Sequence, residues 1–545
     1  MQIESAVFSI DTKTVIYMDN IDKHIVAIDL GTSKIALTVA KVEGNDVQIL
    51  YYHESESKGI RYSSVFNVKD VTETLSAAVA RAEDALNIKI TQAVVGMPKY
   101  PIKEVSANAE LQDRGEDTDI TEDDINLLKN FAQDSYPLED DEKTAIYGAV
   151  AQSFSDGENF QIIEEDIIGM TSDVLEGNFK IFIGKKSDLT KIDQVMSRCE
   201  ITALQKFFTA DTTAKAVLNN SEMENGVALV DFGAGCTSVS IYHGNIMRHY
   251  ASIPFGGRNI TNDIKTELQI TERLAENIKL AYGACMPDKL QSLSEKVLRI
   301  EGSTAGQSKE VTVKYLSEII TARVEEIIQA MLYEISESGL AEHLRGGIVI
   351  TGGASQTANL GMLIKQMSGY NVRIGHPLGQ LSCQDIEGIN ETTAATSAGL
   401  IQAAIEDECM NCAIYDETIH TEIETPVEVP VLNEEPVVEI EEEAPMENVP
   451  AEEVPAVEEE IEEESYPDEE EEEDEELEEI EQEDEAQDDE DEDYDEELDE
   501  DYEDKAKPAK KAGKGENGGL FRKFKIIWNK LNDDTDNWIE GMSKK

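Results

Sequence analysis

The sequence has few of the features that mark secreted, membrane-spanning or metal-binding proteins. Six cysteines in 545 residues are too few for a disulfide framework and are consistent with a reducing cytoplasm. No apolar run approaches the roughly 18–20 residues of a transmembrane helix, and Met1–Lys23 has neither the basic start nor the cleavage site of a secretory signal. The seven histidines show no ligand spacing. Cys409 and Cys412 have the spacing of a zinc or redox pair, but no second pair accompanies them.

Positive charge is also scarce, because 46 Lys and Arg residues stand against 115 Asp and Glu residues, for a net charge of −69. Most of the excess lies between residues 417 and 504, where acidic residues dominate and prolines interrupt the early part. Like charges repel one another there, and too few apolar groups are present to offset the ordering entropy. Residues 413–518 are therefore predicted to form a long disordered acidic linker. The overall charge argues against nucleic-acid binding, which needs a basic surface.

Two short segments carry the most informative pattern in the chain. Each has an apolar strand, a tight glycine turn and a second strand: Ile28-Asp29-Leu30-Gly31-Thr32-Ser33-Lys34 and Val230-Asp231-Phe232-Gly233-Ala234-Gly235-Cys236-Thr237. This pattern predicts a β-hairpin in both places. Glycine lets such a turn bring backbone N–H groups within reach of phosphate oxygens. Two opposed hairpins can hold a triphosphate between two half-domains.

Each hairpin also places an aspartate at the end of its first strand. Asp29 and Asp231 are expected to face each other across one gap and to hold a Mg²⁺ ion through waters. The candidate phosphate-binding residues are Asp29, Gly31, Thr32, Ser33, Lys34, Asp231, Gly233, Ala234, Gly235, Cys236 and Thr237. Cys236 is expected to contribute its backbone N–H rather than its thiol.

A third pattern follows further along the chain. Residues 346–355 indicate a buried strand and a double-glycine turn, followed by a helix with Leu360, Ile364 and Met367 on one face. Without side chains in the way, the turn Gly352-Gly353-Ala354 allows a flat base or ribose to lie against the backbone. In this order the three patterns resemble the actin-like ATPase superfamily, which has two phosphate loops followed by an adenosine loop. ATP with Mg²⁺ is the ligand that this resemblance implies.

The middle of the chain resembles one branch of that superfamily, the FtsA family of bacterial division proteins. The resemblance rests on Gly256-Gly257-Arg258-Asn259-Ile260-Thr261-Asn262-Asp263-Ile264 and Ala275-Glu276-Asn277-Ile278-Lys279, and it extends over residues 23 to 405. It implies that Gly257 and Asn259 line the nucleotide cleft and that Glu276 and Lys279 contact ribose and base. A solvated ion pair between Glu276 and Lys279, three residues apart on a helix, is the alternative.

The resemblance implies an α/β fold of duplicated actin-like (ribonuclease H-like) domains around a nucleotide cleft. Residues 104–190 read as a small inserted α+β subdomain, with Thr121 capping a helix through Ile125, Leu128 and Phe131. In FtsA proteins a subdomain at this place contacts neighbours in filaments. The expected parts are a flexible extension (1–22), the first part of domain I (23–103), the inserted subdomain (104–190), the rest of domain I with the crossover (191–222) and domain II (223–412).

The end of the chain changes from acidic to basic and then becomes amphipathic. Residues 519–545 are predicted to form a membrane-targeting helix and tail, because bulky apolar residues recur at helical spacing opposite basic ones. The membrane-binding candidates are Leu520, Phe521, Arg522, Lys523, Phe524, Lys525, Ile527, Trp528 and Leu531. An amphipathic helix that packs on a partner protein is the alternative.

The segment Phe208–Ala214 departs from the pattern of active hydrolases in the superfamily. Thr209 and Ala210 stand where several bacterial relatives have a Glu-Pro pair that orients the attacking water. Asp211 could substitute for that glutamate, or it could cap the following helix. The sequence therefore predicts ATP binding with at most slow hydrolysis.

The FtsA resemblance implies a division scaffold on the cytoplasmic side of the cell membrane, at the septum. It would polymerise with itself, anchor filaments of the tubulin-like protein FtsZ (the Z ring) and recruit later division proteins. A sugar-kinase-type phosphotransferase shares the two hairpins, but no motif for a catalytic base beside a sugar pocket is present. An actin-like filament protein of cell shape is another alternative, although such proteins usually lack the inserted subdomain and this kind of tail.

Overall fold

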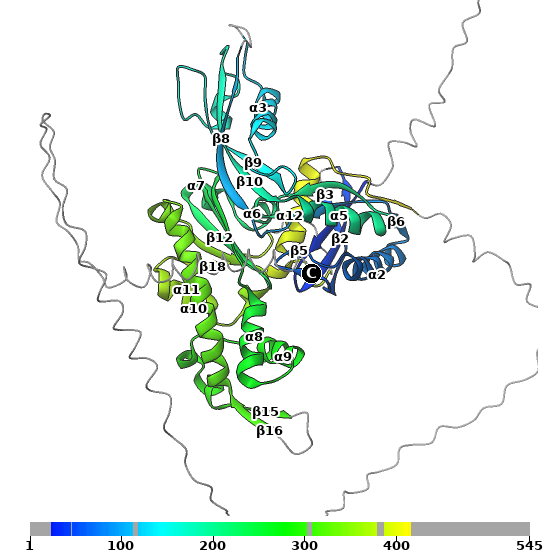
Figure 1. Ribbon diagram of the computed structural model, residues 1–545, viewed down its shortest axis with the longest axis vertical. Helices are drawn as coiled ribbons and strands as arrows, with labels where there is room; N and C mark the ends of the chain where they lie inside the picture. The colour runs from blue at the N-terminus through cyan, green and yellow to red at the C-terminus, as the bar shows by residue number, and fades with distance from the viewer. Residues whose placement is uncertain (1–22, 45, 113–117, 302–307, 379–385, 416–545) are drawn as a thin grey trace, which may run out of the picture. The chain divides into compact units, whose positions relative to one another are not determined.

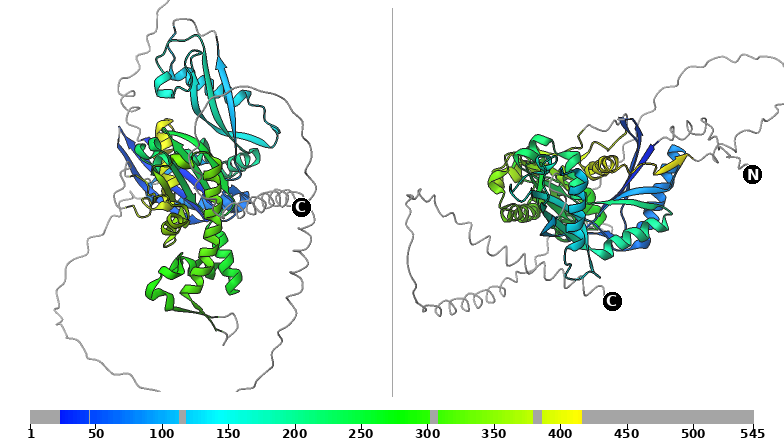
Figure 2. Two further views of the ribbon diagram at one scale, coloured as in Figure 1. Left: turned by 90° about the vertical axis from the view of Figure 1, so that its left-hand side faces the viewer. Right: turned by 90° about the horizontal axis from the view of Figure 1, so that it is seen from above.

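The computed structural model describes residues 23–44, 46–112, 118–301, 308–378 and 386–415 (Figures 1 and 2). The extension 1–22, the acidic linker from residue 416 and the helix expected over 519–545 lie outside the described residues. Within the described part, no helix combines the length and the apolar character needed to cross a membrane.

Two five-stranded sheets have the same topology. The first has the order β11-β7-β1-β2-β3 and the second the order β14-β13-β12-β17-β18. In both, three antiparallel strands are joined to two parallel ones. The first sheet comprises β1 (Lys23–Leu30), β2 (Lys34–Glu43), β3 (Asp46–Glu56), β7 (Gln92–Gly96) and β11 (Thr202–Phe207); the second comprises β12 (Val227–Phe232), β13 (Thr237–His243), β14 (Ile246–Ile253), β17 (Gly347–Thr351) and β18 (Val372–Ile374). The predicted duplicated, actin-like α/β fold is confirmed.

Helices cover these sheets, and their apolar faces supply the cores. Strands β1 and β12 are buried almost throughout, as expected for central strands with both faces covered. The helices around the first sheet are α2 (Val68–Leu86), α5 (Lys186–Arg198) and α6 (Thr209–Val217), with α7 (Asn220–Asn225) leading into the second sheet. The later helices are α8 (Gly257–Leu268), α9 (Glu272–Tyr282), α10 (Val313–Glu337), α11 (Leu360–Ser368) and α12 (Ala395–Glu406). The short strands are β4 (Ile60–Arg61), β5 (Ser64–Val65), β6 (Ile88–Ile90), β15 (Val297–Glu301), β16 (Ser308–Thr312) and β19 (Ala413–Tyr415).

A third sheet forms the subdomain expected in the insertion. Its strands are β8 (Lys103–Leu111), β9 (Thr144–Ser155) and β10 (Leu175–Lys185), accompanied by α3 (Glu122–Ser135) and α4 (Glu164–Ile167). Thr121 caps α3 as predicted, in a reciprocal capping box with Asp124. Ile125 and Leu128 are buried, but Phe131 is 50% exposed and Ala132 lies in the core instead. The difference arises because Ala132, seven residues after Ile125, shares its helix face, whereas Phe131 is turned off that stripe.

A charged cluster joins this subdomain to the second sheet. Glu104 on β8 accepts a hydrogen bond from the backbone N–H of Tyr250 (2.6 Å) and pairs with Lys180 on β10. His249 on β14 lies between two carboxylates, with Nδ1 3.5 Å from Glu104 Oε1 and Nε2 3.8 Å from Glu334 Oε2 on α10. Burial alone would lower the pKa of His249, but the two carboxylates outweigh it and raise the pKa to about 9. At neutral pH the junction therefore contains an imidazolium ion between two carboxylates.

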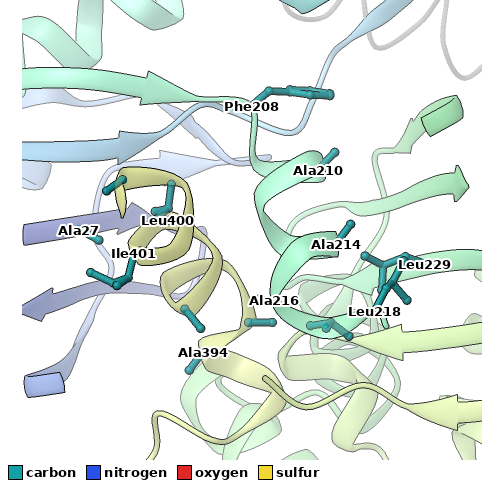
Figure 3. Packing of buried hydrophobic residues seen from close by; sticks show 14 of the residues in the cluster. Ala27, Phe208, Ala210, Ala214, Ala216, Leu218, Leu229, Ala394, Leu400 and Ile401 are labelled. Atoms are coloured by element: carbon teal, nitrogen blue, oxygen red, sulfur yellow. The ribbon is translucent and has the colours of Figure 1, made fainter. Parts of the chain in front are cut away.

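Helices α6 and α12 pack side by side between the two main sheets (Figure 3). In Figure 3, Ile401 on α12 points toward the strand that carries Ala27, while Ala214 on α6 faces Leu229 of the second sheet. Gly399 makes the close approach possible, because a Cβ at this position would collide with the backbone carbonyl of Thr212. The two helices therefore connect the sheets through small residues.

The end of the described chain returns to the first sheet. Helix α12 contacts β1, β2 and β7, although the sequence predicted that residues 223–412 all belong to the second domain. The acidic linker was expected to begin at residue 413, yet Ala413–Tyr415 form β19, which pairs with β6. These residues differ in composition from the acidic stretch, and Cys412 continues the contact by donating its backbone N–H to the carbonyl of His24 (2.9 Å).

Adding one methyl group at Gly399 tests the helix contact. We expect Gly399→Ala to lower the free energy of unfolding by about 1–3 kcal/mol, because the helices must separate to admit the Cβ. Gly361→Ala on α11 is the matched control, since its Cβ would lie 3.7 Å from the nearest atom of Val372. The control should be neutral or stabilising by up to about 1 kcal/mol. Equal midpoints for both variants in urea unfolding would contradict the close packing.

Candidate functional site

Both predicted hairpins open onto one cavity. The turn after β1 and the turn after β12 line a space of about 510 Å³, together with residues from α8, α9 and the loops before α11 and α12. Asp29 and Asp231, each next to the last residue of its strand, both line this space. The two carboxylates are close enough for Asp231 to raise the pKa of Asp29. The expectation that the two aspartates face a common gap therefore agrees with the structure.

The two turns touch each other at Gly235 and Thr32. A Cβ built on Gly235 would lie 2.7 Å from Thr32 Oγ1 and 3.1 Å from Thr32 Cβ. Thr32 cannot yield freely, because its Oγ1 accepts a hydrogen bond from the backbone N–H of Ser63 (2.9 Å). The start of α8 also fixes the second turn. The carbonyls of Gly233 and Ala234 accept hydrogen bonds from the backbone N–H groups of Gly257 (3.0 Å) and Arg258 (2.7 Å). Glycine at position 235 is thus needed for the two loops to close on one ligand.

Charges of both signs gather at the aspartate end of the cavity. Burial raises the pKa of Asp29, and the nearby ammonium groups of Lys99 and Lys34 only partly offset this effect. Lys99 forms an ion pair with Asp231 and donates to Thr396 Oγ1 (3.0 Å). Burial alone would lower the pKa of Lys99, but the charges of Asp231 and Asp29 outweigh it, so the pKa is raised. Lys99 is therefore a buried cation between two acidic groups.

Lys34 lies beside these residues in a second hydrogen-bonded group. Its ammonium pairs with Glu54 and lies 3.3 Å from the hydroxyl of Tyr52. Glu54 also accepts from Thr393 Oγ1 (3.1 Å), which belongs to the turn before α12. Burial alone would raise the pKa of Glu54, but the hydrogen bonds from Lys34 and Tyr52 lower it. This group links the first sheet to the segment that leads into α12.

The residues expected to contact ribose and base line the same cavity beside the start of α8. Lys279 Nζ lies 2.8 Å from Glu276 Oε2, 2.9 Å from Thr261 Oγ1 and 3.1 Å from the carbonyl of Gly257. Glu276 and Lys279 thus form the ion pair that was the alternative reading, and both also line the cavity. Gly352, Gly353 and Ala354 line the same space from the loop after β17.

Most of the predicted nucleotide-binding residues line the cavity, but two of them do not, and neither does the predicted water-positioning residue Asp211. Among the described residues, Thr237, Asn259 and Asp211 are absent from the lining. Thr237 is fully buried and donates to the carbonyl of Phe255 (2.8 Å). Asn259 Oδ1 accepts from the backbone N–H of Gly256 (3.0 Å) at the start of α8, so its side chain holds the helix end instead.

Asp211 lies on α6, away from the cavity. Its carboxylate is 3.5 Å from Lys215 Nζ and 3.5 Å from the hydroxyl of Tyr242. It does not cap the helix either, because the N-cap residue is Phe208, which makes no side-chain bond there. The structure thus does not bring Asp211 to a place from which it could orient a water in the cavity.

Two observations concern metal ligation and the thiol of Cys236. No group of three or more potential metal-ligating His, Cys, Asp or Glu side chains occurs in the described part of the chain. Burial raises the pKa of Cys236 to about 12, so its thiol stays protonated. The expectation that Cys236 offers its backbone rather than its sulfur is compatible with this environment.

Several cavity-lining residues were not predicted from the sequence. They are Glu54, Ser63, Lys99, Ile260, Leu280, Gly283, Gln356, Thr357, Thr392, Thr393, Ala395 and Thr396. A signal for Lys99 does exist: it follows β7, which runs parallel to β1, and the carboxyl ends of parallel strands meet at one sheet edge. That argument needs the strand order, which short motifs do not provide.

Comparison with known proteins finds relatives over most of the described chain. A sequence model described as Cell division protein FtsA matches residues 228–399. Cell division protein FtsA of Neisseria meningitidis serogroup B is 28% identical over 395 residues, which cover 72% of this chain and 92% of the relative. The protein of the same name from Borreliella burgdorferi is 29% identical over 369 residues, covering 67% and 86%. Among solved structures, a chain of the PilM-PilN type IV pilus biogenesis complex aligns with 69% of this chain and 98% of its own length, at 12% identity and a TM-score of 0.48.

Gly235→Ala tests whether contact between the two turns matters for ligand binding. We expect it to weaken ATP binding about tenfold, since the added methyl pushes Thr32 away from its bond to Ser63. Isothermal titration calorimetry with Mg²⁺ present measures the change. Gly148→Ala on β9 is the control, because its Cβ would lie 3.9 Å from the nearest atom and outside the cavity lining. Unchanged ATP affinity in Gly235→Ala would show that the contact is dispensable.

Proposed function

Because this chain belongs to the FtsA family of cell division proteins, we propose that it is a membrane-tethered, actin-like scaffold of the division septum. In this role it binds ATP with Mg²⁺, polymerises and anchors FtsZ filaments to the cytoplasmic face of the cell membrane. The observation that carries the proposal is the meeting of two glycine turns and two aspartates, one set from each sheet, at a single cavity.

The cavity residues suit a nucleoside triphosphate with a divalent cation. Carboxylate oxygens are the ligands that Mg²⁺ prefers, and Asp29 and Asp231 would hold the ion through its water shell. Burial raises the pKa of Asp29, and the nearby lysines offset this effect only in part, so a divalent cation beside it would favour the ionised carboxylate. When bound, the cation supplies positive charge that screens the phosphates from these carboxylates. The turns at Gly31–Ser33 and Gly233–Cys236 supply backbone N–H groups to the phosphates.

ATP acts chiefly as a structural ligand in this proposal. It contacts both sheets, so its binding favours the closed arrangement of the two halves. Hydrolysis is at most slow, because Asp211 points toward Lys215 and Tyr242 rather than into the cavity. Glu54 also lies near the aspartates, but its carboxylate already accepts hydrogen bonds from Lys34, Tyr52 and Thr393. It is therefore not available to orient a water molecule.

The inserted subdomain is proposed to contact a neighbouring copy in the polymer. Three large apolar side chains on it are exposed: Leu127 (56%), Phe131 (50%) and Phe160 (69%). Exposed apolar groups on a small subdomain gain free energy when a second protein covers them. The charged junction around His249 and Glu104 fixes this subdomain to the second sheet, so contact with a neighbour is transmitted to the sheet that carries Asp231.

FtsZ is proposed to bind the part that follows the second phosphate loop, which comprises α8, α9, α10 and the β15–β16 hairpin. Other division proteins are recruited once this assembly is on the membrane. The attachment itself is assigned to the amphipathic segment within residues 519–545, outside the described residues, whose aromatic and basic faces suit an anionic bilayer surface.

Deleting residues 519–545 tests the membrane anchor. We expect the truncated chain to bind Mg²⁺-ATP normally and to remain in the supernatant when anionic vesicles are sedimented, whereas the full chain pellets with them. A matched pair locates the effect: Trp528→Glu removes an apolar anchor, while Lys530→Gln removes one charge, worth about 1 kcal/mol. Trp528→Glu should abolish pelleting and Lys530→Gln should only weaken it. If the chain without residues 519–545 still pelleted with the vesicles, the proposed membrane anchor would be refuted.

Reconstitution with purified FtsZ tests the scaffold. We expect FtsZ, polymerised with GTP, to pellet with vesicles when the full chain and Mg²⁺-ATP are present, and to stay behind when the 519–545 deletion replaces it. The deleted chain should still co-sediment with FtsZ polymers without vesicles, since the proposed FtsZ-binding part is intact. FtsZ that never associates with either form would contradict the scaffold role.

A further inference from the structure

Lys99 is the lysine among the cavity-lining residues that the predicted nucleotide-binding set does not include. It follows β7, and its ammonium group is close enough to both aspartates for their charges to raise its pKa. The ammonium pairs with Asp231 and donates to Thr396 Oγ1 (3.0 Å). Lys99 thus connects the first sheet, the second sheet and the first turn of α12.

The backbone of Lys99 is held firmly from both halves of the protein. Its N–H donates to Ser63 Oγ (3.2 Å) beside β5, and its carbonyl accepts from the hydroxyl of Tyr250 on β14 (2.8 Å). Two residues earlier, the N–H of Met97 donates to the carbonyl of Phe207 (2.8 Å). With its backbone fixed, the ammonium can move only by rotation of the side chain within the cavity.

The other lysines that line the cavity are engaged elsewhere. Lys34 is bound to Glu54 and Tyr52, and Lys279 is bound to Glu276 and Thr261. Lys99 is therefore the lining lysine that faces both aspartates. A triphosphate held by the two glycine turns, as proposed above, brings its terminal phosphate to the two aspartates and to this ammonium group.

We propose that Lys99 is a built-in counter-ion that selects for the terminal phosphate of the nucleotide. In the empty cavity its ammonium neutralises Asp231. When a triphosphate enters, the ammonium turns to the terminal phosphate and releases Asp231, whose oxygens then become available to the water shell of a metal ion. A diphosphate does not reach the ammonium, so the exchange does not occur. This inference rests on the proposed ATP binding and adds the residue that distinguishes ATP from ADP.

The test compares ATP and ADP affinities by calorimetry on the full chain in EDTA, which removes metal ions as a source of positive charge. We expect the wild type to bind ATP more tightly than ADP under these conditions. Lys99→Met keeps the aliphatic stem without the charge, and should weaken ATP binding about tenfold while leaving ADP binding unchanged. Lys206→Met, which removes a lysine paired with Asp193 (2.5 Å) outside the cavity, should change neither affinity.

A second pair of variants covers the case in which Lys99→Met fails to fold because Asp231 is left buried and unpaired. Asp231→Asn keeps the ammonium and should retain the preference for ATP in EDTA, whereas Asp231→Asn combined with Lys99→Met should lose it. Equal ATP-to-ADP ratios with and without Lys99 would overturn the assignment, and so would a wild type that binds ATP only when Mg²⁺ is added. A wild type that binds neither nucleotide, with or without Mg²⁺, would instead refute the proposed function.

Discussion

The close approach of α6 and α12 determines how the rest of the folded chain is arranged. One helix belongs to the crossover between the two sheets and the other returns from the second sheet to the first, and the missing side chain of Gly399 lets them touch. This contact fixes the separation of the two sheets at the level of their central strands. The turns after β1 and β12 can then meet at Gly235 and Thr32, and Asp29 and Asp231 line one cavity. Because protein interiors are close-packed, a fixed distance between the two helices also fixes the positions of the strands and turns that pack against them.

Charge balance is the second constraint on the same region. Two carboxylates placed face to face in a partly buried cleft repel each other, and the structure supplies Lys99 as a compensating cation. The same three groups tie together both sheets and α12. The junction of the inserted subdomain uses a similar arrangement, with the imidazolium of His249 between Glu104 and Glu334. Buried pairs of opposite charge thus lie at the places where separate parts of the chain meet.

The sequence predicted those parts of the fold and of the site that depend on a few consecutive residues. Both hairpins, the cap at Thr121 and the loop at Gly352–Ala354 were identified because turns and caps require particular residues in consecutive positions. Lys99, Glu54 and Thr396 were missed because their place in the cavity depends on strand order and on the return of α12. Asn259 shows the converse case: it belongs to the right segment, but its side chain caps α8. The prediction for Asp211 rests only on its position in the sequence, and in the structure its carboxylate lies near Lys215 instead of lining the cavity.

The short strand β19 has a mechanical consequence if the chain is pulled from beyond residue 415, as the proposed membrane anchor would do. It is the last described element, and it pairs with β6. The adjacent Cys412 bonds through its backbone to His24 near the start of β1, to Thr91 just before β7 and to Gln92, the first residue of β7. Tension applied to the chain beyond residue 415 is therefore borne first by this small ladder. From there the load passes to β1, the strand that carries Asp29. Pulling on the tail strains the same strand that holds one side of the cavity.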